Sequence, residues 1–307
     1  MTLMFERAAV IGAGLIGASL ARALRANGLA GRIAGFDLDA DVRRRARECG
    51  AVDEAPDTLD AALKGAALVI VSTPVGAMPA VLAAVAATAD DGALVIDVGS
   101  VKGAVVEAAA TLSPRVSIVP CHPVAGTEQS GPEAGFASLF DKRWAIITPL
   151  ARADAPYKAA VDKAAALWRA VGSNVEIMDH AHHDLALAIT SHLPHLIAFT
   201  LVGAADDLES VAEAEIVKYS AGGFRDFTRI AASDPVMWRD VFLNNKAAVL
   251  EVLGRFSEEL ALLQRAIRWG DAETLEQVFR RGRELRRAIV AAGQEKDVPN
   301  FGRDAKG

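Results

Sequence analysis

The stretch that decides the fold is Val10-Ile11-Gly12-Ala13-Gly14-Leu15-Ile16-Gly17. Its first two residues end a run over residues 7–11 that predicts a strand, and its last residues begin a helical pattern over residues 15–27. In such a turn the first glycine permits the tight bend, the second lets the backbone approach a pyrophosphate, and the third lets the helix pack on the strand. The stretch therefore predicts a dinucleotide site that includes Gly12, Gly14, Leu15, Ile16 and Gly17.

An acidic residue, Asp37, ends the next predicted strand, residues 32–36, and lies 20 positions after Gly17. Its carboxylate would accept hydrogen bonds from the ribose hydroxyls and would repel a 2′-phosphate. The cofactor we expect is NAD. NADP is the less favoured alternative, because the arginines at 43–45 could alter the local charge balance. A glycine-rich turn without a ligand is the other alternative.

Alternating strand and helix patterns continue along the first half. Further strands are predicted at 67–72, 94–97, 117–120, 144–148 and 174–177, with helices between them, which favours a mostly parallel sheet covered on both faces. From about residue 179 the strand pattern disappears, and helices are predicted at 181–207, 208–220, 234–266 and 272–294, with Asp271 as the N-cap of the last. The expected fold is α/β: a Rossmann-type domain over residues 1–178, followed by an all-helical substrate and dimerisation domain over residues 179–307.

The composition limits the possible partners. A net charge of −6 spread along 307 residues argues against nucleic acid and an anionic membrane surface, since either needs a basic face. Cys49 and Cys121 do not make a disulfide framework, which fits a reduced, cytoplasmic setting, and we expect no signal peptide. Residues 185–205 carry no charge apart from two histidines. Because Ser191, His192, Pro194 and His195 interrupt this run, we expect a helix buried between domains or subunits, not a membrane span, and a homodimer built from the helical half.

Polar segments follow several predicted strands at the sheet edge where ligands bind in such folds. Ser72-Thr73-Pro74 follows one strand and Val98-Gly99-Ser100 follows the next, so we expect Ser72, Thr73 and Pro74 to contact the cofactor. Ordinary loop chemistry is the alternative for both segments. His122 directly follows a third strand, and its near-neutral pKa suits the removal of a hydroxyl proton.

A glycine-rich segment, residues 222–229, is predicted to be a loop that carries Arg225 and Arg229. Paired arginines suit the recognition of a carboxylate. Arg229 is the better candidate, because Arg225 adjoins Asp226 and could form a surface ion pair. Trp238, further along, is more typical of a core residue than of a ligand contact.

Taken together, these segments resemble one enzyme family over residues 7–293. The glycine turn, Val98–Gly103, the segment from His122 to Gly131, Ser191-His192-Leu193-Pro194-His195 and the segment from Gly222 to Arg229 look like those of the prephenate and arogenate dehydrogenases of tyrosine biosynthesis. The resemblance implies an oxidative decarboxylation in which NAD takes a hydride from a cyclohexadienyl ring and the ring carboxylate leaves as carbon dioxide. It does not distinguish prephenate from arogenate, or strictness for NAD.

The resemblance also implies roles for individual residues. His122 and Ser100 would be catalytic, with His122 removing the proton of the ring hydroxyl. The substrate contacts we expect are Arg229, His195, Thr127, Glu128 and Arg225. His192 stays an alternative to His195. We expect no metal, since His180, His182 and His183 match no metal motif and suggest a solvated helix start.

Two other classes stay open. One is a β-hydroxy acid or imine dehydrogenase or reductase of the same two-domain plan. The other is a non-enzymatic NAD-binding protein, since a fold alone does not fix a function. Neither needs a histidine base together with an arginine clamp, which is why the dehydrogenase of cyclohexadienyl acids is the leading hypothesis.

Overall fold

The structure, a computed structural model, describes residues 3–127, 129–207 and 222–291. Glu128 and the predicted helix at 208–220 therefore lie outside the described residues. The chain divides into two compact units, residues 1–250 and 251–307. Each unit is described by itself.

A five-stranded parallel sheet forms the centre of the first unit, in the order β2-β1-β3-β4-β5. Every residue of β3 and β4 is buried. Such continuously buried strands arise where helices cover both faces of a sheet. The strand order reverses between β1 and β3, which leaves a crevice at their carboxyl ends. The strands are β1 (Phe5–Ile11), β2 (Ala30–Phe36), β3 (Leu68–Val71), β4 (Leu94–Asp97) and β5 (Ser117–Val119).

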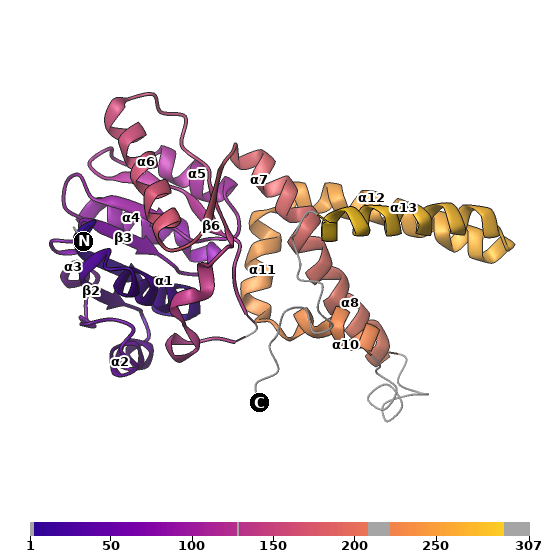
Figure 1. Cartoon of the computed structure of the whole chain (residues 1–307), viewed down its shortest axis with the longest axis horizontal. Helices are drawn as coiled ribbons and strands as arrows, with labels where there is room; N and C mark the ends of the chain where they lie inside the picture. Colours follow the sequence, from indigo (N-terminus) through magenta and orange to yellow (C-terminus); the bar gives the residue numbers. More distant parts are fainter. Residues whose placement is uncertain (1–2, 128, 208–221, 292–307) are drawn as a thin grey trace. The chain divides into compact units, whose positions relative to one another are not determined.

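Six helices accompany this sheet (Figure 1). The aspartate N-caps at Asp39 and Asp154 accept hydrogen bonds from the first turns of α2 and α6, and this fixes where these helices begin. From α6, Tyr157 and Trp168 are fully buried in the core. The helices are α1 (Leu15–Ala26), α2 (Ala40–Glu48), α3 (Leu59–Leu63), α4 (Met78–Thr88), α5 (Gly103–Ala110) and α6 (Ala155–Ala170).

A second, three-stranded sheet was not predicted. It contains β6 (Cys121–Pro123), β7 (Trp144–Ile147) and β8 (Asn174–Ile177), with β6 antiparallel to β7. The prediction that His122 directly follows a strand was therefore wrong, because His122 lies inside β6. Pro120 has no N–H to continue the ladder of β5, and its carbonyl accepts a hydrogen bond from Thr148 N at 3.0 Å. The chain changes sheets at this proline.

The helix predicted at 181–207 is interrupted. It consists of α7 (His180–Leu187), a π-helical turn (Ala188–His192) and α8 (Leu193–Asp207). Pro194 has no N–H to bond the carbonyl of Thr190, which favours a local change of helical pitch. The interruption falls on the histidine-containing segment of the sequence.

The prediction of a loop at 222–229 was also wrong. These residues form α10 (Gly222–Thr228) and the start of a 3-10 turn (Arg229–Ala232). The glycines lie at the beginning of the helix, where helical propensity matters least, and the Thr228 hydroxyl donates to Phe224 O at 2.6 Å within its last turn.

The helix predicted at 234–266 is split at Asn245 into α11 (Pro235–Asn244) and α12 (Lys246–Trp269). In the first unit, α11 packs on the 3-10 turn Val75–Ala77 that follows β3. A small apolar cluster of Val75, Val101, Trp238 and Val241 joins these elements. The loops that follow β3 and β4 therefore pack against α11, a helix from the second half of the sequence.

The second unit contains most of α12 and all of α13 (Ala272–Ala291), joined through Gly270 at φ +69°. Asp271 accepts a hydrogen bond from Thr274 N at 3.1 Å, as expected of the predicted N-cap. None of the residues of α13 is buried in the described structure, and Phe279 is 61% exposed.

One helical stretch, His180–Ala205, is long and apolar enough to cross a membrane by length and composition. Leu187, Ala188 and Ala198 are buried in the first unit, whereas Leu201 and Val202 are exposed. The chain alone therefore covers only part of the apolar surface of this stretch.

Candidate active site

The glycine turn at the crevice has the shape that a dinucleotide requires. Gly12 has φ +94°, and a Cβ at this position would lie 2.6 Å from Ser72 O. A Cβ at Gly17 would lie 2.2 Å from Gly12 O, so helix and strand approach closely there. A Cβ at Gly14 would have no atom within 4 Å from other parts of the chain, which is the open approach a pyrophosphate needs.

The N-terminus of α1 suits an anion. Gly14 provides no side-chain cap, and the first turn, which begins with Leu15 and Ile16, has no acidic residue. The backbone N–H groups of a first turn have no acceptor within the helix, and the helix dipole adds positive potential there. The residues present therefore fit the pyrophosphate of a dinucleotide.

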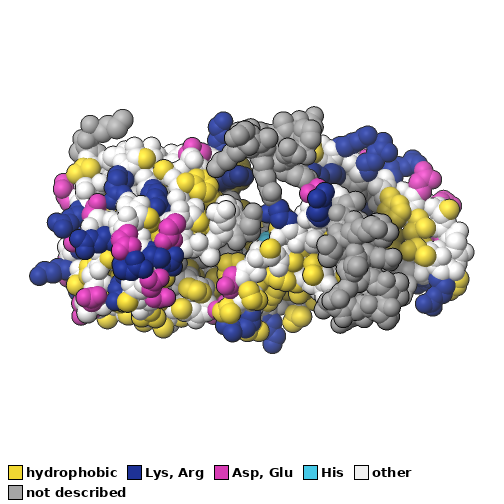
Figure 2. Space-filling model, turned by 90° about the horizontal axis from the view of Figure 1, so that it is seen from below, with side chains coloured by type: hydrophobic (Ala, Val, Ile, Leu, Met, Phe, Trp, Pro, Cys, Tyr) yellow, Lys and Arg dark blue, Asp and Glu magenta, His cyan; other side chains and the backbone are white. Residues whose placement is uncertain are grey.

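Asp37 lies beside this turn, where its carboxylate accepts hydrogen bonds from Ala13 N and Asp39 N, each at 3.1 Å. The nearby arginines are all paired with acids: Arg43 with Asp57, Arg44 with Asp41 and Glu48, and Arg45 with Asp41 and Glu133. Figure 2 shows basic and acidic side chains interspersed over the nucleotide-binding part at the left. A 2′-phosphate would meet Asp37 and would have to displace acids from these arginines, so the arrangement fits NAD better than NADP.

The segment after β3 completes the turn. The Ser72 hydroxyl donates to Gly12 O at 2.6 Å, so Ser72 holds the glycine turn in place. Thr73 Oγ1 is buried and has no hydrogen-bond partner among the described residues. Pro74 is exposed and begins the 3-10 turn that packs on α11.

A buried chain of hydrogen bonds starts at His122, which is 7% exposed. His122 Nδ1 lies 2.8 Å from His183 Nε2, and His183 Nδ1 lies 2.8 Å from Asp184 Oδ1. His183 is fully buried, so the expected solvated helix start was wrong for this residue. Asp179 caps α7, and His183, Asp184 and Leu187 then share its buried face. The spacing of Leu187 from His183 is the sequence signal that could have revealed this.

Asp184 is anchored at the N-terminus of α5. Its Oδ1 accepts from Lys102 N and its Oδ2 from Gly103 N, each at 2.8 Å. A Cβ at Gly103 would lie 2.9 Å from Asp184 Oδ2, so glycine permits the close approach. Burial raises the pKa of Asp184, but the hydrogen bonds from His183 and from these two N–H groups outweigh it, and the pKa is lowered overall. Asp184 is therefore an anion at neutral pH.

Both histidines of this chain of hydrogen bonds are neutral near pH 7. Burial is the main cause that lowers the pKa of His122 well below 6.5, with smaller contributions from His183 and the Lys102 charge. Burial also lowers the pKa of His183, although Asp184 opposes the change. A neutral, buried imidazole can accept a proton, which is the requirement for a general base.

A buried ion pair between Asp97 and Lys102 contacts the backbone beside Ser100 and beside His122, the two candidate catalytic residues. Asp97 accepts from Gly99 N at 2.8 Å and from Cys121 N at 3.0 Å, and Lys102 Nζ donates to Cys121 O at 2.7 Å. Ser100 follows Gly99 and is half-buried. One ion pair thus fixes the backbone next to Ser100 and next to His122.

A second polar cluster surrounds His192, which is fully buried. Asn245 Nδ2 donates to Asp184 O at 2.8 Å and lies 3.1 Å from His192 Nδ1. Because an amide nitrogen can only donate, His192 Nδ1 is the acceptor and its Nε2 carries the proton. His192 Nε2 is buried without a partner among the described residues, and the same holds for Trp238 Nε1.

His195 and Arg229 lie close to this second cluster. The ring of His195 stacks on that of Trp238 at 3.6 Å between centroids, and its Nδ1 bonds Ser191 O at 2.8 Å. Burial is the main cause of the lowered pKa of His195, and the Arg229 charge lowers it further, so the guanidinium is near the imidazole. Burial lowers the pKa of His192 to about 4.

Other predicted contacts lie at the surface of the described structure. Arg225 is exposed on α10, and Thr127 is exposed in the loop after β6, where its hydroxyl accepts from Gln129 N at 3.2 Å. The structure does not place these two residues in either buried cluster. Among the described residues no group of His, Cys, Asp and Glu could hold a metal ion.

Comparisons with known proteins identify the family. Residues 20–177 match the prephenate dehydrogenase nucleotide-binding domain, and residues 179–281 match the prephenate dehydrogenase dimerization domain. The chain is 40% identical to cyclohexadienyl dehydrogenase of Zymomonas mobilis, covering 93% of this chain and 97% of that protein. It is 34% identical to prephenate dehydrogenase of Bacillus subtilis, and the match covers 98% of this chain and 80% of that protein.

A solved structure agrees with these relatives. The crystal structure of prephenate dehydrogenase from Aquifex aeolicus, in complex with hydroxyphenyl propionate and NAD+, superposes with a TM-score of 0.84 at 33% identity, covering 94% of this chain and all of that one. The family, the Rossmann-type fold with a helical C-terminal part and NAD as the cofactor were all predicted from the sequence and are confirmed by these comparisons. The chain belongs to the prephenate dehydrogenase family.

Proposed function

We propose that this protein catalyses the NAD-dependent oxidative decarboxylation of prephenate, arogenate or both, as a step in tyrosine biosynthesis. The observation that carries the proposal is the buried, neutral His122 in a chain whose relatives are named for this activity. The glycine turn supports NAD as the hydride acceptor, because its open face and uncapped helix fit a pyrophosphate.

For this reaction the protein has two main tasks: it orients the substrate against the cofactor, and it removes a proton from the substrate hydroxyl. When bound at the glycine turn, NAD supplies the acceptor for the hydride that leaves ring carbon 4. We assign His122 to the removal of the hydroxyl proton on that carbon, with Ser100 beside it. The bond to the ring carboxylate breaks, its electron pair enters the ring and moves onto the ring oxygen, and carbon dioxide leaves. That oxygen takes the proton back from His122 as the phenol forms. Aromatisation provides driving force, so a correctly placed base is the main catalytic requirement.

The second cluster supports an anionic substrate. His192 Nε2 and Trp238 Nε1 are buried N–H donors without partners in the described structure, a costly arrangement unless a ligand accepts from them. Prephenate and arogenate carry two carboxylates, and Arg229 and His195 lie nearby to complete the site. We propose that the cluster of His192, His195, Trp238 and Arg229 receives a substrate carboxylate. Thr127, Glu128 and Arg225 stay proposals from the sequence resemblance: Thr127 and Arg225 are exposed, and Glu128 lies outside the described residues.

The test is direct. Purified protein is mixed with prephenate or arogenate and with NAD or NADP, and the absorbance of the reduced cofactor is followed. We expect turnover with at least one of the two acids, with kcat/KM higher for NAD than for NADP. No reduced cofactor with either acid would contradict the proposal.

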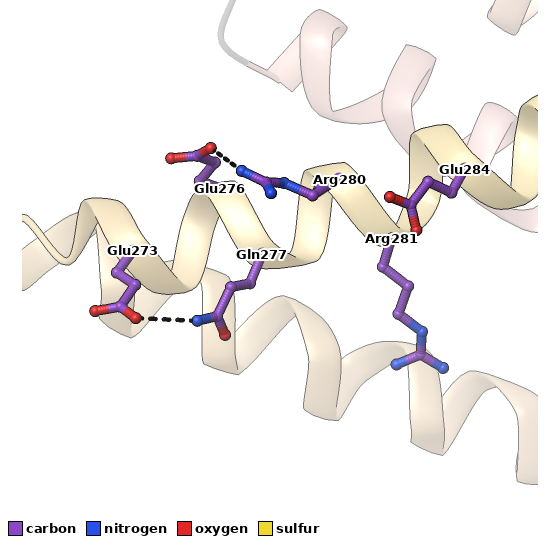
Figure 3. Close-up of a pocket in the computed structure, with 6 residues that line it drawn as sticks. All are labelled: Glu273, Glu276, Gln277, Arg280, Arg281 and Glu284. Atoms are coloured by element: carbon purple, nitrogen blue, oxygen red, sulfur yellow. Dashed lines mark hydrogen bonds and ion pairs between the residues drawn. The ribbon is translucent and has the colours of Figure 1, made fainter.

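We also propose a homodimer formed through the helical part. Residues 179–281 match a dimerization domain, and α12 and α13 expose large apolar side chains that include Ile267, Trp269 and Phe279. On α13 a hollow of about 360 Å³ is lined by Glu273, Glu276, Gln277, Arg280, Arg281 and Glu284 (Figure 3). Light scattering should give twice the chain mass, and Phe279→Glu should reduce the dimer fraction. A wild-type monomer at micromolar concentration would refute this proposal.

Two smaller expectations complete the proposal. The division at residues 178 and 179 is supported by the family matches, which end at 177 and begin again at 179. A cytoplasmic location is supported by Cys49 and Cys121, both of which are free thiols.

A further inference from the structure

We propose that His183 and Asp184 are positioning residues that hold His122 in one tautomer, with the proton on Nδ1 and a free electron pair on Nε2. The inference rests on the proposed function and assigns the atom of His122 that accepts the substrate proton. It is carried by the three-residue chain of hydrogen bonds, His122–His183–Asp184, together with the backbone bonds that fix Asp184.

The protons can be assigned by starting from the carboxylate. Asp184 is an anion and can only accept, so the nitrogen of His183 that faces it, Nδ1, must carry a proton. Neutral His183 then has no proton on Nε2, which makes that nitrogen an acceptor. His122 Nδ1 lies 2.8 Å from it and must donate. The only nitrogen of neutral His122 left to take a proton is Nε2.

Asp184 cannot easily reverse this arrangement. Its Oδ1 and Oδ2 accept from Lys102 N and Gly103 N at the N-terminus of α5, where the helix dipole favours a negative charge. The aspartate side chain is therefore held in one orientation and one charge state. His183 is fully buried between Asp184 and His122, so water does not compete for its nitrogens.

The same chain of hydrogen bonds stabilises His122 after it accepts a proton. His122 then becomes an imidazolium in a buried site, which is unfavourable without a nearby negative charge. Its Nδ1–H donates to His183, whose opposite nitrogen faces the Asp184 anion. We infer that the Asp184 charge acts on His122 through the polarised imidazole of His183, in the way that a carboxylate supports the histidine of a catalytic triad.

The kinetic test compares three variants with a matched control. His183→Leu removes the acceptor and should lower kcat by about 100-fold or more, the contribution typical of a general base. His183→Gln offers an amide oxygen to His122 Nδ1 and should retain kcat within about tenfold of wild type. Asp184→Asn should lower kcat by about 100-fold, and by no more than His122→Asn does, because the tautomer of His122 is then no longer fixed. His182→Gln, an exposed change on the same helix, should leave kcat unchanged.

A direct measurement does not depend on turnover. The ¹⁵N NMR spectrum of histidine-labelled protein, with His122 assigned from the spectrum of His122→Asn, should show a protonated Nδ1 and an unprotonated Nε2 near pH 7. In His183→Leu the two tautomers of His122 should become mixed. A wild-type His122 protonated on Nε2 would overturn the inference.

The outcomes separate this inference from the proposed function. If wild-type protein oxidises neither acid, the proposed function fails, while the NMR spectrum still decides the tautomer. If wild-type protein is active and all His183 and Asp184 variants keep its kcat, the positioning role is wrong. Equal losses in His183→Leu and His183→Gln, with thermal stability lowered equally in both, would show a merely structural role and would also overturn the inference.

Discussion

The two polar clusters of this protein differ in how completely their hydrogen bonds are satisfied. In the cluster of His122, His183 and Asp184, both joining contacts are 2.8 Å and the carboxylate is held by two backbone N–H groups. In the cluster of His192, His195, Trp238 and Arg229, two buried N–H groups have no partner within the described chain. The first is preorganised by the protein alone, whereas the second has donors that a ligand would complete.

This difference fits the separate tasks that we propose for the two clusters. A base must have a defined proton position before the substrate arrives, so its hydrogen bonds are closed within the chain. A site for an anion can leave donors open, because the carboxylate satisfies them on binding. Changes in the first cluster should therefore act on kcat, and changes in the second should act on KM.

The largest effect is expected at His122. His122→Asn removes the proton acceptor and should lower kcat by two or more orders of magnitude. The dissociation constant of NAD, measured by calorimetry, should change little, because the glycine turn is not altered. Unchanged turnover would remove His122 from the mechanism and, with it, the distinction between the clusters.

Arg229 should give the next largest effect, on KM. If Arg229 binds a substrate carboxylate as proposed, Arg229→Ala removes a charge-assisted hydrogen bond, and KM should rise roughly 10- to 100-fold. Arg255→Ala, which disrupts an exposed ion pair with Glu251, is the matched control. Loss of NAD binding with an unaltered substrate KM would place Arg229 at the cofactor and not in the second cluster.

His192 should have a smaller effect of the same kind. His192→Leu removes one N–H donor from the proposed substrate site and should raise KM about tenfold with little change in kcat. Steady-state kinetics at saturating NAD separate the two parameters. A fall in kcat with constant KM would mean that His192 belongs functionally with His122.

The last prediction concerns stability against pH. The pKa of His192 is about 4 in the folded protein, below the ordinary value of 6.5. Between these values the unfolded chain binds a proton that the folded protein does not, so the free energy of unfolding falls as the pH decreases from 6.5 towards 4. His192→Gln should lose this dependence, about 2 kcal/mol between pH 6.5 and 5. Urea unfolding curves that respond to pH equally in both proteins would contradict the lowered pKa.

The sequence predicted the parts of the molecule that depend on local pattern. The glycine turn, Asp37 and the strands of the first sheet follow from spacing and apolar runs, which report local geometry directly. Asp271 at the start of α13 is a similar case. The second sheet was missed because β6 is only three residues long and depends on pairing with residues of β7 that lie 22 to 26 positions along the chain.

The histidine cluster was harder to predict for a physical reason. His183 lies among two other histidines at a helix start, and nothing local shows that α7 packs against the N-terminus of α5. The contact of His183 with His122 also joins residues that are 61 positions apart. The prediction of a loop at 222–229 was wrong for a different reason. The glycines suggested a loop, whereas Phe224 and Phe227 are three positions apart, a spacing that suits one face of a helix.

The π-helical turn at Ala188–His192 determines the direction in which the side chains of α8 point. An α-helix advances about 100° per residue, so the wider turn changes the direction in which each later side chain points. His195, which faces Trp238, and Leu201 and Val202, which face outward, both follow this turn on α8. Deleting Thr190 would restore regular α-helical pitch and rotate these residues together. The orientation of His195 in the second cluster and that of the exposed Leu201 and Val202 are thus coupled through five residues of backbone.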